Sequence, residues 1–230
     1  MNKTFVLFQK DFKQLLFSFT GFISLILFPL LLSIWIIFVV HFFDQTDADF
    51  TLYFSMYPTI MILLIPIISI KLSIDDHRWK TDGLMKTLPF SEGSIIIARF
   101  IAIFAIFILM YTGSLVFPFS LMSHGNFDTG KILTNIIGLL FLGSASISLC
   151  ILVSTIVPGS MLSWIISTIT LILLGTTFLS GGILSPFTFS SHMESFSRGI
   201  LCVGDMLYFI LIVFFSLYIS IKVIFLRRWS

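Results

Sequence analysis

The sequence predicts an all-α integral membrane protein, and three observations carry that prediction. Hydrophobic residues make up 57% of the 230 positions and charged residues only 10%, whereas a soluble domain carries about 25% charged residues. Apolar runs of roughly 20 residues, the length that crosses about 30 Å of hydrocarbon as a helix, alternate with short polar loops. The stretch between Lys131 and Glu194 contains no Asp, Glu, Lys or Arg. We therefore expect a single transmembrane domain over residues 1–230.

The first element is expected to be an interfacial helix over residues 3–19, lying flat on the inner leaflet. Its apolar residues recur at helical spacing, and its lysines fall on the other face, toward anionic headgroups. The apolar set is Phe5, Phe8, Phe12, Leu15, Leu16 and Phe19, and the polar set is Lys3, Lys10, Lys13 and Gln14. The simpler alternative is an ordinary amphipathic leader that only anchors the chain.

Six transmembrane helices are expected to follow, at about 20–42, 51–72, 94–119, 132–157, 160–180 and 206–226. The Pro158-Gly159 pair divides the uncharged region, which is too long for one helix. Pro29, Pro58 and Pro66 lie in the first two spans, where neighbouring helices can satisfy the carbonyls that proline leaves free.

The basic residues set the orientation of these spans. With the N-terminus in the cytoplasm, only Lys131 and Arg198 fall on the outer side. The basic residues on or near the inner side are Lys3, Lys10, Lys13, Lys71, Arg78, Lys80, Lys86, Arg99, Lys222, Arg227 and Arg228. This bias predicts that both termini are cytoplasmic.

The span interiors argue against several classes of function. No charged residue lies near mid-depth, which disfavours ion-coupled carriers and pumps. The polar groups there are hydroxyls and one amide, and their packing within and between helices is favoured over a substrate site. The small run Gly143-Ser144-Ala145-Ser146 fits close helix packing, either within the chain or between subunits. Cys150 and Cys202 are expected at different depths, which argues against a disulfide.

No catalytic, cofactor or metal site is expected in this chain. The stretch from Gly125 to Lys131 resembles a phosphate-binding loop, but Ile132 stands where a Ser or Thr is required. The four histidines are far apart and form no cluster with ligand spacing.

The inner loop over residues 73–92 carries the most information. Asp75 and Asp76 suit the first turn of a short cytoplasmic helix that Pro89 would end. Leu84 and Met85 add an apolar anchor to the charged rim, which is ordinary interface anatomy. The loop therefore suits docking on a soluble motor, and a plain solvated loop is the alternative.

This loop resembles the signature of ABC type-2 transporter permeases. Asp75 and Asp76 stand at the paired acidic positions, His77 and Arg78 at the basic positions, and Thr81 at the signature threonine. Leu84 and Met85 stand at the aliphatic pair, and Pro89-Phe90-Ser91 at the closing motif. Lys80 and Gly83 depart from the signature, which has Gly and Glu there.

Two further segments are similar to the gliding-motility-type branch of that family. Near the N-terminus these are Lys10-Asp11-Phe12, Ser18 and Gly21-Phe22. Near the C-terminus they are the run from Glu194 to Gly199, then Asp205, Tyr208-Phe209 and Arg227-Arg228-Trp229. The likeness covers essentially the whole chain.

The resemblance implies a half-transporter in the bacterial inner membrane. Its expected partners are an ABC ATPase subunit that binds ATP and Mg²⁺, a second permease subunit (a copy or a paralogue) and the lipid bilayer. A periplasmic or accessory membrane subunit is left open, and no nucleic acid is expected. Residues 3–19 would be the elbow helix. The implied ATPase-coupling residues are Asp75, Asp76, His77, Arg78, Trp79, Thr81, Leu84, Met85 and Pro89.

The resemblance also implies an outward, partly re-entrant gate over residues 181–205, before the sixth span. Its residues would be Glu194, Phe196, Arg198, Gly199, Asp205 and Tyr208. A solvated outer loop is the alternative for the charged members.

Three functions remain open at this point. The leading one is ATP-driven transport, with export as the expected direction. The second is a membrane scaffold that transmits ATPase-driven force to a periplasmic or surface assembly without moving a substrate. The third, a channel or ion-coupled carrier, is disfavoured by the uncharged span interiors.

Overall fold

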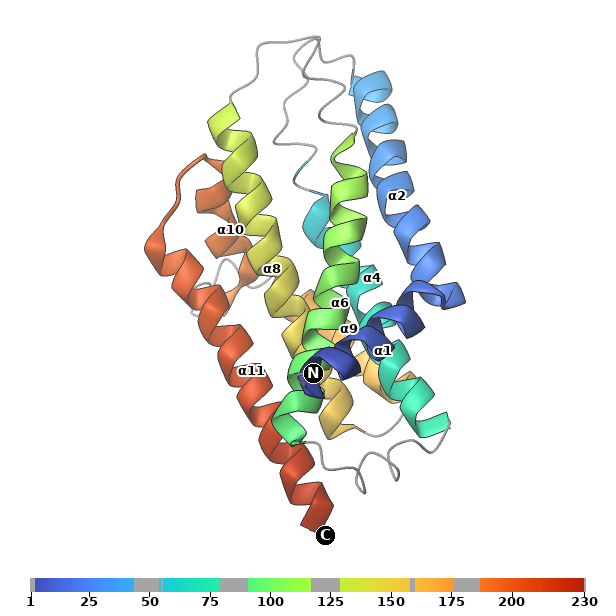
Figure 1. The fold of residues 1–230 in the computed structure, drawn as a ribbon. Coiled ribbons are helices and arrows are strands. Elements are labelled where there is room, and N and C mark those ends of the chain that lie inside the picture. The colour runs from blue at the N-terminus through green and yellow to red at the C-terminus, as the bar shows by residue number, and fades with distance from the viewer. Residues whose placement is uncertain are drawn as a thin grey trace.

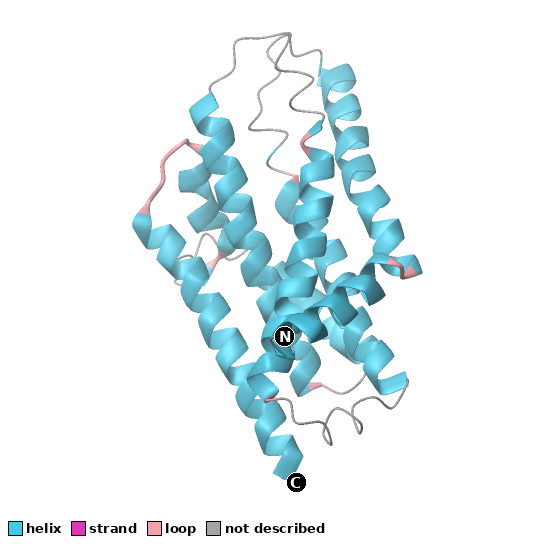
Figure 2. Cartoon of the chain, in the orientation of Figure 1, coloured by secondary structure: helices cyan, strands magenta, loops and turns pink. Residues whose placement is uncertain are grey.

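The computed structural model describes residues 3–43, 54, 56–78, 91–116, 129–157, 160–175 and 187–229. All regular secondary structure in these residues is helical (Figure 1, Figure 2). The helices are α1 (Lys3–Leu16), α2 (Phe19–Phe43), α4 (Tyr57–Arg78), α6 (Glu92–Ser114), α8 (Thr129–Ile156), α9 (Ser160–Gly175), α10 (Phe189–Ser197) and α11 (Val203–Trp229).

Each of the six apolar runs overlaps one helix, and residues 51–53, 55, 117–119 and 176–180 of these runs lie outside the described residues. By length and composition, Glu92–Ser114, Gly130–Ile156 and Val203–Leu226 could each cross a membrane. The bent pair Thr4–Leu16 and Phe19–Trp35 passes the same test as a fourth span. Tyr57–Leu72 and Met161–Gly175 are shorter apolar helices. The protein is therefore a helical, multi-pass membrane protein, and a count of six crossings stays a prediction.

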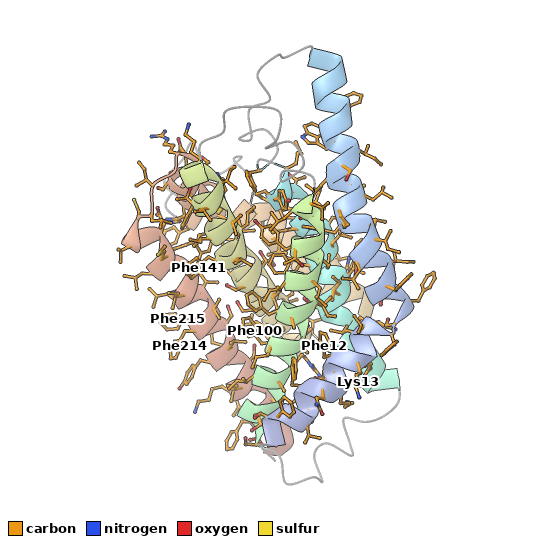
Figure 3. All side chains as sticks on the ribbon, turned by 45° about the horizontal axis from the view of Figure 1, so that its top comes forward. Phe12, Lys13, Phe100, Phe141, Phe214 and Phe215 are labelled. Atoms are coloured by element: carbon orange, nitrogen blue, oxygen red, sulfur yellow. The ribbon has the colours of Figure 1, made fainter. Side chains whose placement is uncertain are left out.

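Helix α8 occupies the middle of the bundle and α11 its periphery. α8 packs against α11, α4, α6 and α9, and 61% of its apolar window is buried, compared with 17% for α11. Phe214 and Phe215 project from the outer side of α11, where both side chains are exposed (Figure 3). In a membrane protein this exposed apolar side suits contact with lipid, because lipid tails are as apolar as the side chains themselves.

Close contact between α6 and α8 depends on Gly143. A Cβ atom at Gly143 would lie 2.4 Å from the Phe107 ring of α6. Phe104, Phe107 and Tyr111 follow one another along α6, with 6.1 Å between successive ring centroids. The glycine of the run at 143–146 is therefore explained by packing within the chain.

Hydroxyl groups in the spans bond mainly to their own helices. Ser33 Oγ donates to the Pro29 carbonyl at 2.6 Å, and Thr170 Oγ1 donates to the Ile166 carbonyl at 2.8 Å. Both bonds reach back one turn, as expected for hydroxyls that pack against the backbone in a helix. A longer-range bond joins Tyr57 Oη of α4 to Ser114 Oγ of α6 at 2.9 Å.

Helix α1 lies across the face of α6 and meets α2 at a sharp bend (Figure 1). The angle between the two helices is 68°. A Cβ atom at Gly21 would lie 1.9 Å from the Leu15 carbonyl oxygen, so only glycine fits at this close approach of the backbone. The sharp bend between α1 and α2 therefore depends on Gly21.

The face that α1 buries differs from the apolar face predicted from its sequence. Leu7, Asp11 and Leu15 form the buried stripe, whereas Phe5 is 50% exposed and Phe19, at the start of α2, is 80% exposed. Packing on α6 selects this stripe at spacing i, i+4, i+8. The sequence pattern predicted one apolar face because it assumed a single apolar partner, the membrane.

Candidate functional site

The outer candidate site is built on α10 and the turn that follows it. The helix begins after Thr188, whose extended backbone (φ −88°, ψ 142°) is typical of an N-cap residue. Ser191 Oγ donates to the Thr188 carbonyl at 2.8 Å, which closes this first turn. α10 is only 9 residues long, so it depends on packing for its stability.

Gly199 ends α10 and turns the chain back toward α11. The Gly199 N–H donates to the Phe196 carbonyl at 3.1 Å, and the Ile200 N–H donates to the Ser195 carbonyl at 3.0 Å. This pair of bonds is the Schellman motif, and it places the glycine in the left-handed region, at φ +87°. A Cβ atom there would lie 3.1 Å from Lys131 Cγ. The glycine is required both by the turn and by the closeness of α8.

Phe196 fixes α10 against α8. Its side chain is fully buried, and a Cβ atom at Gly138 would lie 2.7 Å from its ring. Thr134 Oγ1 lies 3.0 Å from the Phe196 carbonyl and donates to it. Neither Gly138 nor Thr134 was predicted as part of the site, because both lie in an uncharged span and carry no sequence signal of their own.

A group of aromatic rings packs α10 onto α11. The ring centroids of Phe189 and Phe209 lie 5.7 Å apart, and those of Phe196 and Phe209 lie 6.4 Å apart. All three side chains are buried. The aromatic side of α10 is therefore packed against the bundle in this structure.

His192 joins α10 to α11 through polar contacts at the edge of these rings. Its Nδ1 lies 2.7 Å from Asp205 Oδ1, so the ring N–H donates to the carboxylate. The imidazole also stacks on the Tyr208 ring, with 3.9 Å between centroids and 21° between planes. Tyr208 Oη donates in turn to the Phe187 carbonyl at 2.5 Å. Asp205 and Tyr208 of α11 thus both contact His192 of α10, and their role in a gate stays a prediction.

Glu194 and Arg198 lie apart from this cluster. They pair with each other one turn apart on α10, and their side chains are 60% and 68% exposed. Such surface pairs contribute little to stability because water screens them. Of the six predicted gate residues, Phe196, Gly199, Asp205 and Tyr208 make the inter-helix contacts, and the two charged residues form a solvated face.

The structure describes part of the inner candidate site. The backbone of Asp75, Asp76, His77 and Arg78 continues α4 to its end at Arg78. The expectation that the acidic pair opens a separate helix is therefore wrong. Nothing between Lys71 and Arg78 breaks a helix, and the first breaker is Gly83. Trp79, Thr81, Leu84, Met85 and Pro89 lie outside the described residues.

The next described residue after Arg78 is Ser91, which is the N-cap of α6. The Ser94 N–H donates to Ser91 Oγ at 3.3 Å, and Glu92 lies in the first turn.

Two turns further on, Arg99 is 8% exposed, and Asp11 of the overlying α1 is 5% exposed. Arg99 was counted among the basic residues on or near the inner side, and the packing of α1 on α6 covers this end of the helix. Sequence alone did not predict two buried charges here.

The residues that the structure describes include no group of three or more His, Cys, Asp or Glu that could hold a metal ion. Cys150 is buried and Cys202 is partly exposed, and both are free thiols.

One comparison with known proteins gives a match. A family model described as "ABC-2 family transporter protein" matches residues 3–224. A search of curated proteins finds no match.

Proposed function

Because this chain belongs to the ABC-2 transporter family, we propose that it is the membrane-spanning permease subunit of an ATP-driven transporter. The observation that carries the proposal is the family match over residues 3–224. ATP hydrolysis, with its Mg²⁺, would take place in a separate ATPase subunit. The proposal includes a second permease subunit, export as the direction, a bacterial inner membrane, and cytoplasmic termini. The gliding-motility-type branch stays a prediction from the two terminal segments.

The coupling role is proposed for residues 73–92, which join α4 to α6. The last turn of α4, the first turn of α6 and the C-terminal end of α11 lie at one end of the bundle (Figure 1). A load applied to this segment would act directly on α6, which packs against α1, α2 and α8. A packed bundle of this kind responds by shifting between discrete arrangements, which is how a motor at one end can change access at the other.

The gate role is proposed for α10 and its turn, which lie in the opposite half of the bundle (Figure 1). α10 contacts α8, α9 and α11, so it would respond to any shift among these three helices. The His192–Asp205 contact that joins it to α11 is partly exposed, so separating this pair requires little energy compared with opening the aromatic core.

A force-transmitting scaffold is the second candidate. The solvated Glu194–Arg198 face of α10 favours it, because a polar, exposed helix face suits contact with another protein outside the membrane. Crosslinks from this face to a second protein, together with no ATPase-dependent flux of a substrate, would support the scaffold over the transporter.

The test of the coupling role is charge reversal at the acidic pair. We expect Asp75→Lys with Asp76→Lys to abolish stimulation of the copurified ATPase by the permease while membrane insertion is kept. The matched control is Asp44→Lys with Asp47→Lys, the same change in the loop predicted on the outer side, which should leave the stimulation unchanged. Full stimulation in the Asp75 and Asp76 variant, with the ATPase still bound, would refute the coupling role.

A further inference from the structure

His192 is placed to respond to pH. Histidine is the side chain whose charge ordinarily changes between about pH 5 and 8. The His192 ring makes two contacts whose strength depends on that charge: its Nδ1 donates to the Asp205 carboxylate at 2.7 Å, and its centroid lies 3.9 Å from the centroid of the Tyr208 ring. Its side chain is 20% exposed and that of Asp205 is 15% exposed, so protons can reach the pair while water screens it only in part.

The titratable groups on the described helices that pack around His192 are the following. Of the helices packed against α10, α9 contains no titratable residue. In the described part of α8 the titratable residues are Lys131, which lies beside Gly199, and Cys150, which is buried deep in the span. From α11, Asp205 and Tyr208 face the ring. On α10 itself, Glu194 is engaged by Arg198.

We infer that His192 is a pH-sensitive latch, which holds α10 closed on α11 more firmly when its ring is protonated than when it is neutral. A neutral ring keeps one hydrogen bond to Asp205. A protonated ring makes that bond charge-assisted, which roughly doubles its strength, and adds a cation–π contact with Tyr208. Rising pH removes both gains, so the latch weakens as pH rises.

The inference rests on the proposed gate role of α10, but its test measures how firmly α10 packs on α11 and does not measure transport. The full-length chain in lipid nanodiscs would be followed by hydrogen–deuterium exchange at about pH 5.5 and about pH 8. The quantity compared is the protection of the amides at 190–197 after correction for the intrinsic exchange rate at each pH. For a partly exposed charge pair we expect about threefold greater protection at the lower pH.

Two variants and one control decide the outcome. His192→Gln keeps a polar side chain but does not titrate, and we expect no difference in protection between the two pH values. Asp205→Asn removes only the charge of the partner and should reduce the difference as well. Glu194→Gln, a carboxylate on the same helix outside the latch, should keep the wild-type difference. Amides at 139–150 in α8 report whether each variant is folded.

Equal protection of α10 at both pH values in the wild type would overturn the inference. A pH difference that persists in His192→Gln, or in Asp205→Asn if the first variant does not fold, would overturn it equally. Either result would leave the ATPase-coupled role of residues 73–92 untouched, because that role is tested at the other end of the bundle.

Discussion

At the scale of single residues, Gly199 constrains the outer segment most tightly. Its φ of +87° strains any L side chain, and a Cβ atom there would make a tight contact of 3.1 Å with Lys131 Cγ. We expect Gly199→Ala to destabilise the protein by about 1–2 kcal/mol, the cost of a left-handed conformation for an L-residue. Gly204→Ala is the control, since a Cβ atom there meets nothing within 4 Å. Thermal unfolding in detergent measures both, and equal melting temperatures would contradict the argument.

Gly138 tests whether α10 depends on α8. Alanine there would force its Cβ against the Phe196 ring, 2.7 Å away, at a cost of about 1–3 kcal/mol. We expect Gly138→Ala to loosen α10 and to speed tryptic cleavage after the exposed Arg198. Gly113→Ala, where a Cβ atom has open space, should leave the cleavage rate unchanged. If both variants are cleaved at the wild-type rate, α10 is not held by Phe196.

The residues of the outer site were only partly predictable. Asp205, Tyr208 and Gly199 were predicted from the family resemblance. His192 was considered only as a metal ligand and was missed as a contact of Asp205. Its partner is 13 residues away, across a helix end and a tight turn, and no periodic pattern links positions on two different helices. Thr134 and Gly138 were missed for the same reason.

At the scale of elements, the bend between α1 and α2 is the feature most open to test. Gly21→Ala would bring its Cβ to 1.9 Å from the Leu15 carbonyl oxygen, so we expect the 68° bend to open and α1 to move off α6. Spin labels on the exposed Val6 and Ile34 would then report a longer distance. Gly93→Ala, whose Cβ makes only an ordinary contact at 3.8 Å, is the control. An unchanged distance in Gly21→Ala would refute the role of this glycine.

The long helices were predictable because membrane spans depend on length and apolarity, which are properties of contiguous sequence. The run at 20–42 corresponds to the helix Phe19–Phe43, and a separate helix, Lys3–Leu16, precedes it, whose interfacial position stays a prediction. The end of α4 was predicted wrongly. Acidic residues favour the first turn of a helix, but Asp75 and Asp76 lie in the last turns of α4, which continues to Arg78. The burial of Asp11 and Arg99 was not predictable, since it depends on which face α1 turns toward α6.

At the scale of the whole molecule, α10 lies in the opposite half of the packed bundle from the last turn of α4 and the first turn of α6 (Figure 1). α8 runs between them and contacts α4, α6, α10 and α11. A helix that packs against α10 and against both helices flanking the proposed coupling segment would provide a continuous route by which a shift in one half of the bundle changes the packing in the other. The proposed permease would then need no chemistry of its own, because the energy would enter from the ATPase.

The most direct test of this account is photocrosslinking in intact cells from a reactive residue at Met85, in the proposed coupling segment. We expect a crosslink to an ATPase that has a phosphate-binding loop, and none from the same reactive residue at Asp47, in the loop predicted on the outer side. No crosslink to any nucleotide hydrolase, or labelling of position 85 by a reagent confined to the outer side of the membrane, would contradict the account.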